Sequence, residues 1–500
     1  MTNKPYDLVV VGGGINGAGI AADAAGRGLR VLLVEANDLA GATSSASSKL
    51  IHGGLRYLEQ YAFRLVREAL AEREVLLAKA PHIIWPLRFV LPHAPGMRPV
   101  PLLRAGLFLY DHLSPRRTLG ASASLDLRQN AAGEPLAADF YRGFAYWDCW
   151  VDDARLVVLN AIAARDKGAE VLTRTQVTGI EVAGDVWRVT FGSNATAKTV
   201  TARAVVNAAG PWVTEVARLA LGNRNQPPPK VRMVKGSHIV VPRIIGADDA
   251  YIFQNTDGRV VFALPFEQNF TLIGTTDTAY SGDPRACRVT AGDEAYLIGV
   301  ANRYFRTPLT SANVVWQFAG VRPLEDDGSD NPSAVSRDYH LDLETTGGPP
   351  ILHVVGGKIT TYRRLAEAAL DLLKPHLTMG PSRTAGCALP GGDVGDAGYT
   401  TWFDALAARR AGFERRDLQR LARRYGTRIE ALLGDSHSPA DLGADLGAHL
   451  SVREVEFLKR EEWATTADDV IWRRTKTALH VPREMRTALA DRVQRVLDAI

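Results

Sequence analysis

The sequence is poor in cysteine and shows no internal repeat, low-complexity tract or secretory leader. Its three cysteines, Cys149, Cys287 and Cys387, stand far apart among 500 residues. An odd, sparse set of this kind implies neither a disulfide framework nor a zinc site and suits a reducing cytosol. The opening MTNKPYDLVVVGGG lacks a signal-peptide pattern, so we expect a cytoplasmic protein.

Long apolar runs and a strong charge of either sign are also missing. No stretch reaches the ~18 uninterrupted apolar residues that span a bilayer; the nearest, residues 97–113, is broken by two prolines and an arginine. Lys and Arg outnumber Asp and Glu by 59 to 55, and a net charge of +4 is too thin to indicate nucleic-acid binding. With 46% hydrophobic and 23% charged residues, the chain is neither disordered nor collagen-like, and its length allows about three domains.

The first 36 residues carry the pattern of a dinucleotide-binding β-α-β unit. A buried-strand run at 7–11 leads into the glycine turn GGGING, a helix with small inner side chains follows, and a second strand at 30–34 ends on an acid. The first glycine permits the tight turn, the second lets the backbone approach a pyrophosphate, and the third lets helix and strand pack closely. The acid is placed to accept from a ribose hydroxyl. We therefore expect cofactor contacts from Gly12, Gly14, Asn16, Gly17 and Glu35.

Two further segments favour a cofactor longer than NAD. The run TSSASSKLIHGGLR at 43–56 supplies hydroxyls, a lysine and backbone donors just past the ribose-binding strand, as a ribityl chain would need. Gly356-Gly357-Lys358 enters a helix and offers more backbone donors. Taken singly, the first segment is also compatible with a polar surface loop and the second with an ordinary turn.

Strand patterns recur in dispersed positions along the chain. Signals typical of parallel strands occur at 1–60, near 205 and near 355, while the alternation at 170–191 and 231–273 suggests antiparallel pairing. This predicts an α/β fold in which an antiparallel domain is inserted between the pieces of a nucleotide-binding domain. We expect a nucleotide-binding domain at 1–75, 150–225 and 320–378, a substrate domain at 76–149 and 226–319, a glycine-rich linker at 379–398 and a helical domain at 399–500.

Five strings in this order resemble the aerobic, FAD-dependent glycerol-3-phosphate dehydrogenases: GGGINGAGIA, SSASSKLIHGGLRYLE, VVNAAGPW, KGSHIVVP and VVGGKITTYR. The similarity is strong from residue 5 to about 375, whereas the tail is similar only in length and character. It implies a flavoprotein fold of the glycine-oxidase type, with a split Rossmann-like FAD domain, an antiparallel substrate domain and a helical C-terminal domain. It also implies oxidation of sn-glycerol 3-phosphate to dihydroxyacetone phosphate, with electrons passed from FAD to membrane quinone.

The resemblance also implies a set of site residues. A phosphate dianion in a desolvated pocket needs several fixed cations, and arginine binds its oxygens two at a time. Arg322, Lys358 and His238 are expected to be catalytic, with His238 as general base and His52 as its competitor. We expect the substrate to be bound by Arg56, Tyr57 and Arg337. The remaining expected FAD contacts are Thr43, Ser44, Ser45, Ser47, Lys49, His52, Gly53, Gly54, Ala209, Gly210, Gly357, Lys358 and Thr360.

Two surface features bear on partners. The segment 97–113 mixes apolar side chains with arginines, which suggests contact with lipid near the quinone exit; a core segment of the substrate domain is the alternative. Between 409 and 428, eight arginines stand with only two acids, which suggests contact with anionic headgroups; a solvated helix face or a homodimer contact is the alternative. We expect peripheral association with the inner face of the cytoplasmic membrane.

Other functions share parts of this pattern. A hydrogen-peroxide-forming glycerol-3-phosphate oxidase of the same fold would differ only in its electron acceptor. A non-catalytic flavin- or NAD-binding regulatory module would not need phosphate-binding arginines from distant segments. No EF-hand loop occurs, so calcium control is not expected, and we expect neither a metal site nor nucleic-acid binding.

Overall fold

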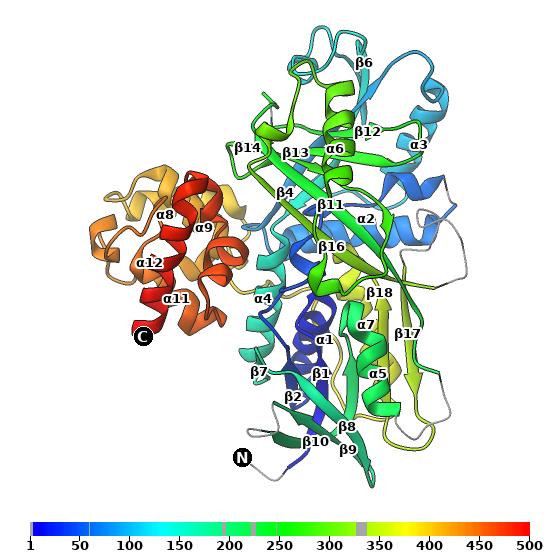
Figure 1. The fold of residues 1–500 in the computed structure, drawn as a ribbon, viewed down its shortest axis with the longest axis vertical. Coiled ribbons are helices and arrows are strands. Elements are labelled where there is room, and N and C mark those ends of the chain that lie inside the picture. The colour runs from blue at the N-terminus through cyan, green and yellow to red at the C-terminus, as the bar shows by residue number, and fades with distance from the viewer. Residues whose placement is uncertain (1–3, 60, 193–196, 222–226, 247, 327–337) are drawn as a thin grey trace.

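The computed structural model describes residues 4–59, 61–192, 197–221, 227–246, 248–326 and 338–500. Two β-sheets lie one above the other in the view of Figure 1, and a helical C-terminal part packs beside them. The predicted α/β fold class is confirmed.

The first sheet has eight strands and is parallel at its centre. Its order is β17-β18-β10-β1-β2-β7, with β9 also pairing with β10 and β8 pairing with β9. The pairs β18-β10, β10-β1, β1-β2 and β2-β7 are parallel, and β17 is antiparallel. The strands are β1 Tyr6–Val11, β2 Val31–Val34, β7 Glu170–Leu172, β8 Val177–Ala183, β9 Val186–Phe191, β10 Lys198–Asn207, β17 Tyr339–Glu344 and β18 Ile351–Gly356.

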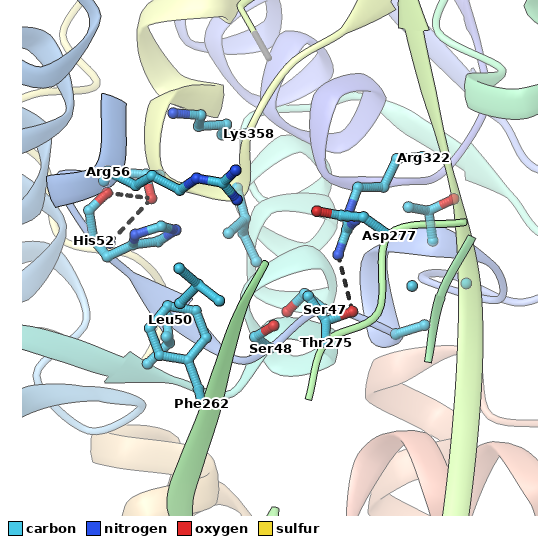
Figure 2. Close-up of a pocket in the computed structure, with 18 of the residues that line it drawn as sticks. Ser47, Ser48, Leu50, His52, Arg56, Phe262, Thr275, Asp277, Arg322 and Lys358 are labelled. Atoms are coloured by element: carbon cyan, nitrogen blue, oxygen red, sulfur yellow. Dashed lines mark hydrogen bonds and ion pairs between the residues drawn. The ribbon is translucent and has the colours of Figure 1, made fainter. Parts of the chain in front are cut away.

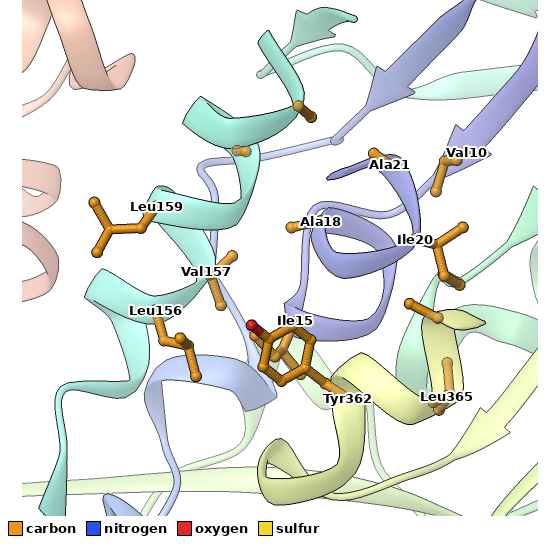
Figure 3. Packing of buried hydrophobic residues seen from close by; sticks show 14 of the residues in the cluster. Val10, Ile15, Ala18, Ile20, Ala21, Leu156, Val157, Leu159, Tyr362 and Leu365 are labelled. Carbon is orange, nitrogen blue, oxygen red and sulfur yellow. The ribbon is translucent and has the colours of Figure 1, made fainter. Parts of the chain in front are cut away.

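Three helices cover one face of this sheet: α1 (Ile15–Gly26), α4 (Asp153–Arg165) and α7 (Tyr362–Leu373). Their shared core is shown in Figure 3, where Ala18 and Ala21 of α1 lie between the larger side chains of its neighbours. Small residues on α1 allow this close packing, because a Cβ at Gly19 would lie 2.6 Å from the ring of Tyr362. Helix α5 (Val213–Leu221) and the β8-β9 hairpin lie over the other face.

The second sheet has ten strands and is largely antiparallel. Its order is β15-β11-β14-β13-β12-β4-β6-β3, with β16 added on β11 and β5 on β6. Helix α6 (Ala291–Tyr304) packs on one core, and α2 (Phe63–Lys79) and α3 (Val100–His112) pack on the other. The strands are β3 Leu50–Ile51, β4 Ile84–His93, β5 Ala123–Asp126, β6 Arg142–Val151, β11 Val231–Pro242, β12 Ala250–Gln254, β13 Val260–Phe266, β14 Phe270–Gly274, β15 Thr278–Ala279 and β16 Trp316–Glu325.

The C-terminal part is helical and has its own hydrophobic core. Besides short turns it contains a six-residue π-helix, η10 (Asp469–Arg474), a rare form that is frequent at functional sites. Its α-helices are α8 Gly398–Arg409, α9 Arg415–Tyr425, α10 Ile429–Leu433, α11 Val452–Glu462 and α12 Arg486–Ala499.

The structure differs from two local predictions. Strand β7 pairs in parallel with β2, not antiparallel, because α4 returns the chain to the edge of the first sheet. The domain boundary expected at residue 320 falls inside β16, whose ten residues all pair with β11 of the second sheet. An alternating strand at a junction does not reveal which of two sheets it joins.

Candidate active site

A cavity of about 520 Å³ opens at the carboxyl ends of the parallel strands. It is bordered by the glycine turn before α1, by the end of β2 and by the turns after β10 and β18. Ligands of open α/β sheets bind at such strand ends. Of the predicted cofactor residues it is lined by Gly12, Gly14, Asn16, Glu35, Thr43, Ser44, Ala209, Gly210 and Gly357.

The glycine fingerprint is required by close backbone contacts. Gly12 has a φ of +110°, and a Cβ there would lie 2.5 Å from the carbonyl oxygen of Ala208. A Cβ at Gly17 would lie 1.9 Å from the carbonyl oxygen of Gly12. Gly17 therefore does not line the cavity but lets α1 approach the turn, as expected of the third glycine.

Two polar side chains at this turn fit a dinucleotide. Glu35 accepts from the amide of Gly13 at 2.6 Å and from that of Asn37 at 2.7 Å, and burial raises the pKa of its carboxyl above the ordinary value. Asn16 donates to the carbonyl of Gly356 at 3.0 Å. Its own Oδ1 is buried and has no hydrogen-bond partner in the described part of the chain, so a bound group could satisfy it.

A second cavity of about 250 Å³ continues from the first between the two sheets and is shown in Figure 2. The two cavities share Ile15, Thr43, Ser44, Pro323 and Gly357 as walls. In Figure 2, Arg56 and Lys358 lie on one side and Arg322 with Asp277 on the other. Three cations from three separate segments therefore face one small cavity.

Arg322 is the most firmly oriented of these cations. Its Nη1 lies 2.5 Å from Asp277 Oδ1, and its Nη2 donates to Thr275 Oγ1 at 3.2 Å. Gly236, opposite on β11, makes room for this arrangement, because a Cβ there would lie 2.6 Å from both Arg322 Nη2 and Thr275 Oγ1. The glycine of the KGSHIVVP string thus leaves space for the guanidinium of Arg322.

The HGGLRY segment and the turn after β18 form the opposite wall. Lys358 Nζ lies 3.6 Å from the centre of the Tyr57 ring, a cation–π contact. Gly54 has a φ of +78°, and a Cβ there would lie 2.2 Å from the same ring. Arg56 has no ion-pair partner within the described ranges. Lys358 and Arg56 thus lie on the same side of the cavity, as Figure 2 shows.

The two histidines proposed for proton transfer occupy different positions. His52 lines the second cavity, and its amide donates to Thr360 Oγ1 at 3.2 Å. His238 lies behind the wall with its Nε2 2.9 Å from Ser48 Oγ and its ring stacked on Phe318. Burial, together with the charges of Arg322 and Lys49, holds the pKa of His238 well below its ordinary value.

The other predicted residues are divided among three places. Ser47, Gly54 and Thr360 line the second cavity with His52, whereas Ser45 and Lys49 line a third cavity on the outer side of the same loop. Gly53 lies behind the site, where its amide donates to the hydroxyl of Tyr110 at 2.9 Å. Arg337 lies outside the described residues.

Several lining residues were not expected from the sequence. The far end of the first cavity is lined by residues 175–178, which follow β7, and by Trp212. The second cavity also contains Thr275, Asp277 and Phe262. The string GTTDT after a buried strand was a usable signal for Thr275 and Asp277, because polar side chains cluster where strands end. Phe262 gives no such signal, since it resembles any core residue of an alternating strand.

Within the described residues, His, Cys, Asp and Glu side chains nowhere gather in a group of three or more that could hold a metal ion. The described helices include none that is both long and apolar enough to cross a bilayer.

Comparison with known proteins agrees with this geometry. A family model described as FAD dependent oxidoreductase matches residues 7–363, and one described as C-terminal domain of alpha-glycerophosphate oxidase matches 382–499. On this fold, a cavity at the glycine turn suits an extended dinucleotide, and the smaller cavity beside it suits a small anion. This combination indicates the class of protein. The chain belongs to the FAD-dependent oxidoreductases.

Relatives that match this chain over its whole length identify a family within this class. A glycerol-3-phosphate dehydrogenase from Pseudomonas aeruginosa is 52% identical over 492 residues, covering 98% of this chain and 95% of its own. A D-erythritol 1-phosphate dehydrogenase from Brucella abortus is 50% identical over 494 residues and covers 97% of each chain. The crystal structure of a Bacillus halodurans glycerol-3-phosphate dehydrogenase complexed with FAD has a TM-score of 0.78 at 27% identity, covering 100% of this chain and 94% of that one. The chain is a member of the glycerol-3-phosphate dehydrogenase family, and the predicted enzyme class and FAD cofactor are confirmed.

Proposed function

We propose that the protein oxidises sn-glycerol 3-phosphate to dihydroxyacetone phosphate and passes the electrons to a membrane quinone. The observation that carries this proposal is the convergence of Arg56, Arg322 and Lys358 on one cavity that continues into the FAD cavity. A small phosphate ester is the ligand that needs such a set of cations beside a flavin. The name of the Pseudomonas relative supports the same substrate.

The cations have different tasks in this proposal. Arg56, without an acidic partner in the described part of the chain, binds the phosphate with Lys358, and the motif match adds Arg337. Arg322 is held by Asp277 and Thr275, so it keeps a fixed direction. A preoriented cation stabilises the negative charge that develops on the C2 oxygen as the base removes its proton, and this charge is relieved when the hydride leaves C2 and the carbonyl forms.

FAD is held by the glycine turn, Glu35 and the hydroxyls of the 43–47 loop in this proposal. Ile15 N donates to Ser44 Oγ at 3.0 Å, which fixes that loop at the N-terminus of α1, where phosphates bind. When FAD is bound, it supplies the flavin N5 atom that accepts the hydride from C2.

A base must take the proton of the C2 hydroxyl. His52 is the better placed of the two histidines, because its ring lines the cavity and His238 reaches the cavity only through Ser48. The lowered pKa also makes His238 a weak base, since protonating it adds a buried charge beside Arg322. We assign proton transfer to His52 and give His238 the role of orienting Ser48.

The exposed apolar face of α3 supports docking on a membrane. Leu102 and Phe108 are 61% and 64% exposed, and Tyr61, on the adjoining loop, is 81% exposed. Such side chains on one surface helix suit the boundary of headgroups and acyl chains. A quinone dissolved in the bilayer is then within reach of the enzyme, which we place at the inner face of the cytoplasmic membrane.

The arginine cluster at 409–428 contributes little to this docking. Arg409 and Arg410 pair with Glu430, and Arg420 and Arg424 pair with Glu454. Arg415 pairs with Asp404, and Arg428 lies 3.6 Å from Glu461. Acids outside this window thus pair with six of its eight arginines, so the patch is less basic than the sequence window suggests.

An anaerobic flavin titration tests the proposed reaction. Purified protein should show the visible absorption of oxidised flavin, and this band should bleach when glycerol 3-phosphate is added without oxygen. A short-chain quinone should then restore it. If glycerol 3-phosphate bleaches the flavin and only oxygen restores it, glycerol 3-phosphate would be supported as the substrate, but quinone would be contradicted as the electron acceptor.

An oxidase is the second candidate function. The C-terminal family model carries the description of an alpha-glycerophosphate oxidase, which favours oxygen as an acceptor. Oxygen uptake with stoichiometric peroxide, and no acceleration by quinone, would support it. The exposed face of α3 favours the membrane acceptor.

A further inference from the structure

We propose that the C-terminal helical part positions the FAD-binding loop through three cations at the end of its π-helix. These cations, Arg473, Arg474 and Lys476, are called the clamp, and residues 38–49, which wrap the cofactor cavities, are called the flavin loop. The clamp contacts one end of the flavin loop directly and the other end through α4. FAD binding by this protein is thereby linked to a part of the chain that lines neither the FAD cavity nor the second cavity.

The first contact is at the start of the flavin loop. Arg474 makes a bidentate ion pair with Asp38, with Nη1–Oδ2 and Nη2–Oδ1 distances of 2.7 and 2.8 Å, and Arg473 Nε lies 2.6 Å from the same carboxylate. Asp38 is 2% exposed, and Arg474 is fully buried. Buried fork-to-carboxylate pairs of this kind fix direction as well as distance. Asp38 stands three residues after Glu35, so the clamp holds the turn that follows the ribose-binding strand.

The second contact runs through two adjacent acids at the N-terminus of α4. Lys476 Nζ lies 2.6 Å from Asp152 Oδ2. The next residue, Asp153, accepts from Lys49 Nζ at 2.8 Å and from Ser47 Oγ at 2.7 Å. Asp153 and Lys49 are both buried, and the charge of Lys476 keeps the pKa of Asp152 below its ordinary value despite burial. One acid thus faces the clamp and its neighbour faces the flavin loop.

The flavin loop is held by hydrogen bonds on one side and borders a cavity on the other. On its inner side the flavin loop is tied by Thr43 Oγ1, which donates to Val321 O at 2.6 Å, and by Ser44, which accepts from Ile15 N. Its outer side faces a third cavity of about 600 Å³, lined in part by Arg473 and Lys476. On that side Lys49 also lies over the Phe318 ring, with its Nζ 5.1 Å from the ring centre, and the ion pairs at the two ends of the loop restrict its movement.

Thr43 and Ser44 line both the FAD cavity and the second cavity, so the position of this loop determines how closely a bound FAD is enclosed. The clamp residues are therefore positioning residues that act on FAD through the loop. Loosening the clamp should speed the release of FAD without changing the groups that face the substrate.

The test is the rate of FAD release from purified holoenzyme, followed by the rise in flavin fluorescence after dilution. Lys476→Met should raise this rate at least tenfold, and Arg473→Met should do the same, while Lys476→Arg should restore the slow release. Arg410→Met is the matched control, because Arg410 also pairs with an acid of the C-terminal part, Glu430, but does not contact the flavin loop. Melting temperatures of all four variants are measured in parallel.

Unchanged FAD release in both Lys476→Met and Arg473→Met would overturn the proposal. Equal acceleration in Arg410→Met would also overturn it, because general loosening of the C-terminal part would then be the cause. These outcomes are independent of the substrate, since no turnover is measured.

Discussion

Ser48 Oγ lies 2.9 Å from His238 Nε2, and of these two residues only Ser48 lines the active-site cavity. The histidine of the KGSH string is thus separated from the cavity by one residue. Its depressed pKa follows from burial beside two cations, and the same burial makes it a poor proton acceptor.

We predict that His52→Ala lowers the rate of flavin reduction by roughly 10²-fold to 10⁴-fold, the usual contribution of a positioned base. His238→Ala should lower it less than about tenfold, because Ser48 and Arg322 remain in place. Anaerobic stopped-flow absorption measures both rates under saturating substrate. A larger loss of flavin-reduction rate in His238→Ala than in His52→Ala would indicate that His238 is the general base.

Gly236→Ala should weaken substrate use without removing FAD. The new methyl group would lie 2.6 Å from Arg322 Nη2, so the guanidinium must shift away from Asp277. A misplacement of this size reduces kcat/KM by roughly 10-fold to 100-fold. The control is Gly299→Ala in α6, where the added methyl group would meet only open space. Loss of bound FAD in Gly236→Ala, or an equal loss of activity in Gly299→Ala, would contradict this account.

His82 should make the protein less stable in mild acid. It is fully buried at the junction with the C-terminal part, where burial and the charges of Arg155, Arg423 and Arg428 lower its pKa to about 3. In the unfolded chain this histidine titrates near its ordinary value of 6.5. The folded form takes up this proton only at far lower pH. The contribution of His82 to the free energy of unfolding is therefore fully present above about pH 6.5 and is lost as the pH falls toward 3.

Linkage gives a loss of about 2 kcal/mol from this one group between pH 7 and pH 5. Thermal unfolding at pH 7 and at pH 5 measures this loss as the fall in melting temperature of the same protein between the two pH values. His82→Leu removes the titration, so its melting temperature should fall less over the same interval. An identical fall in both proteins would show that other groups cause the acid sensitivity.

Membrane docking should depend on α3 and not on the arginine cluster. Burying a Leu or Phe side chain contributes roughly 1.5–3 kcal/mol, so Leu102→Ser and Phe108→Ser should each weaken binding to anionic vesicles by about tenfold or more. Arg409→Gln and Arg415→Gln should leave binding nearly unchanged, because both arginines already pair with acids. Sedimentation with vesicles of mixed zwitterionic and anionic lipid measures this. The reverse ranking would place the lipid contact on the C-terminal part.

The cofactor end of the fold was largely predictable from the sequence. The glycine turn, the small face of α1 and Glu35 are local features, and their geometry depends on residues within about one β-α-β unit. The strand signals near 205 and near 355 were also visible in the sequence, and they correspond to the end of β10 and to β18. Local spacing determines these features, so a sequence pattern suffices.

The substrate end was only partly predictable. Arg56, Arg322 and Lys358 were found by motif resemblance, but the sequence did not show that Asp277 and Thr275 hold Arg322 or that Lys358 lies over the ring of Tyr57. Two other ion pairs could not be predicted from the sequence for the same reason. Arg424 of α9 pairs with Glu454 of another helix, and Arg474 of the clamp pairs with Asp38, hundreds of positions away. Pairings of this kind follow from tertiary packing, which no window of the sequence contains.

The most direct test of the central claim is the rate of anaerobic flavin reduction by three alcohols: glycerol 3-phosphate, D-erythritol 1-phosphate and glycerol. We predict that glycerol 3-phosphate bleaches the flavin with the highest ratio of reduction rate to dissociation constant. Glycerol should not bleach it, because glycerol lacks the phosphate proposed to bind Arg56 and Lys358. Faster reduction by D-erythritol 1-phosphate would contradict the proposed substrate, and reduction by glycerol would contradict the phosphate site itself.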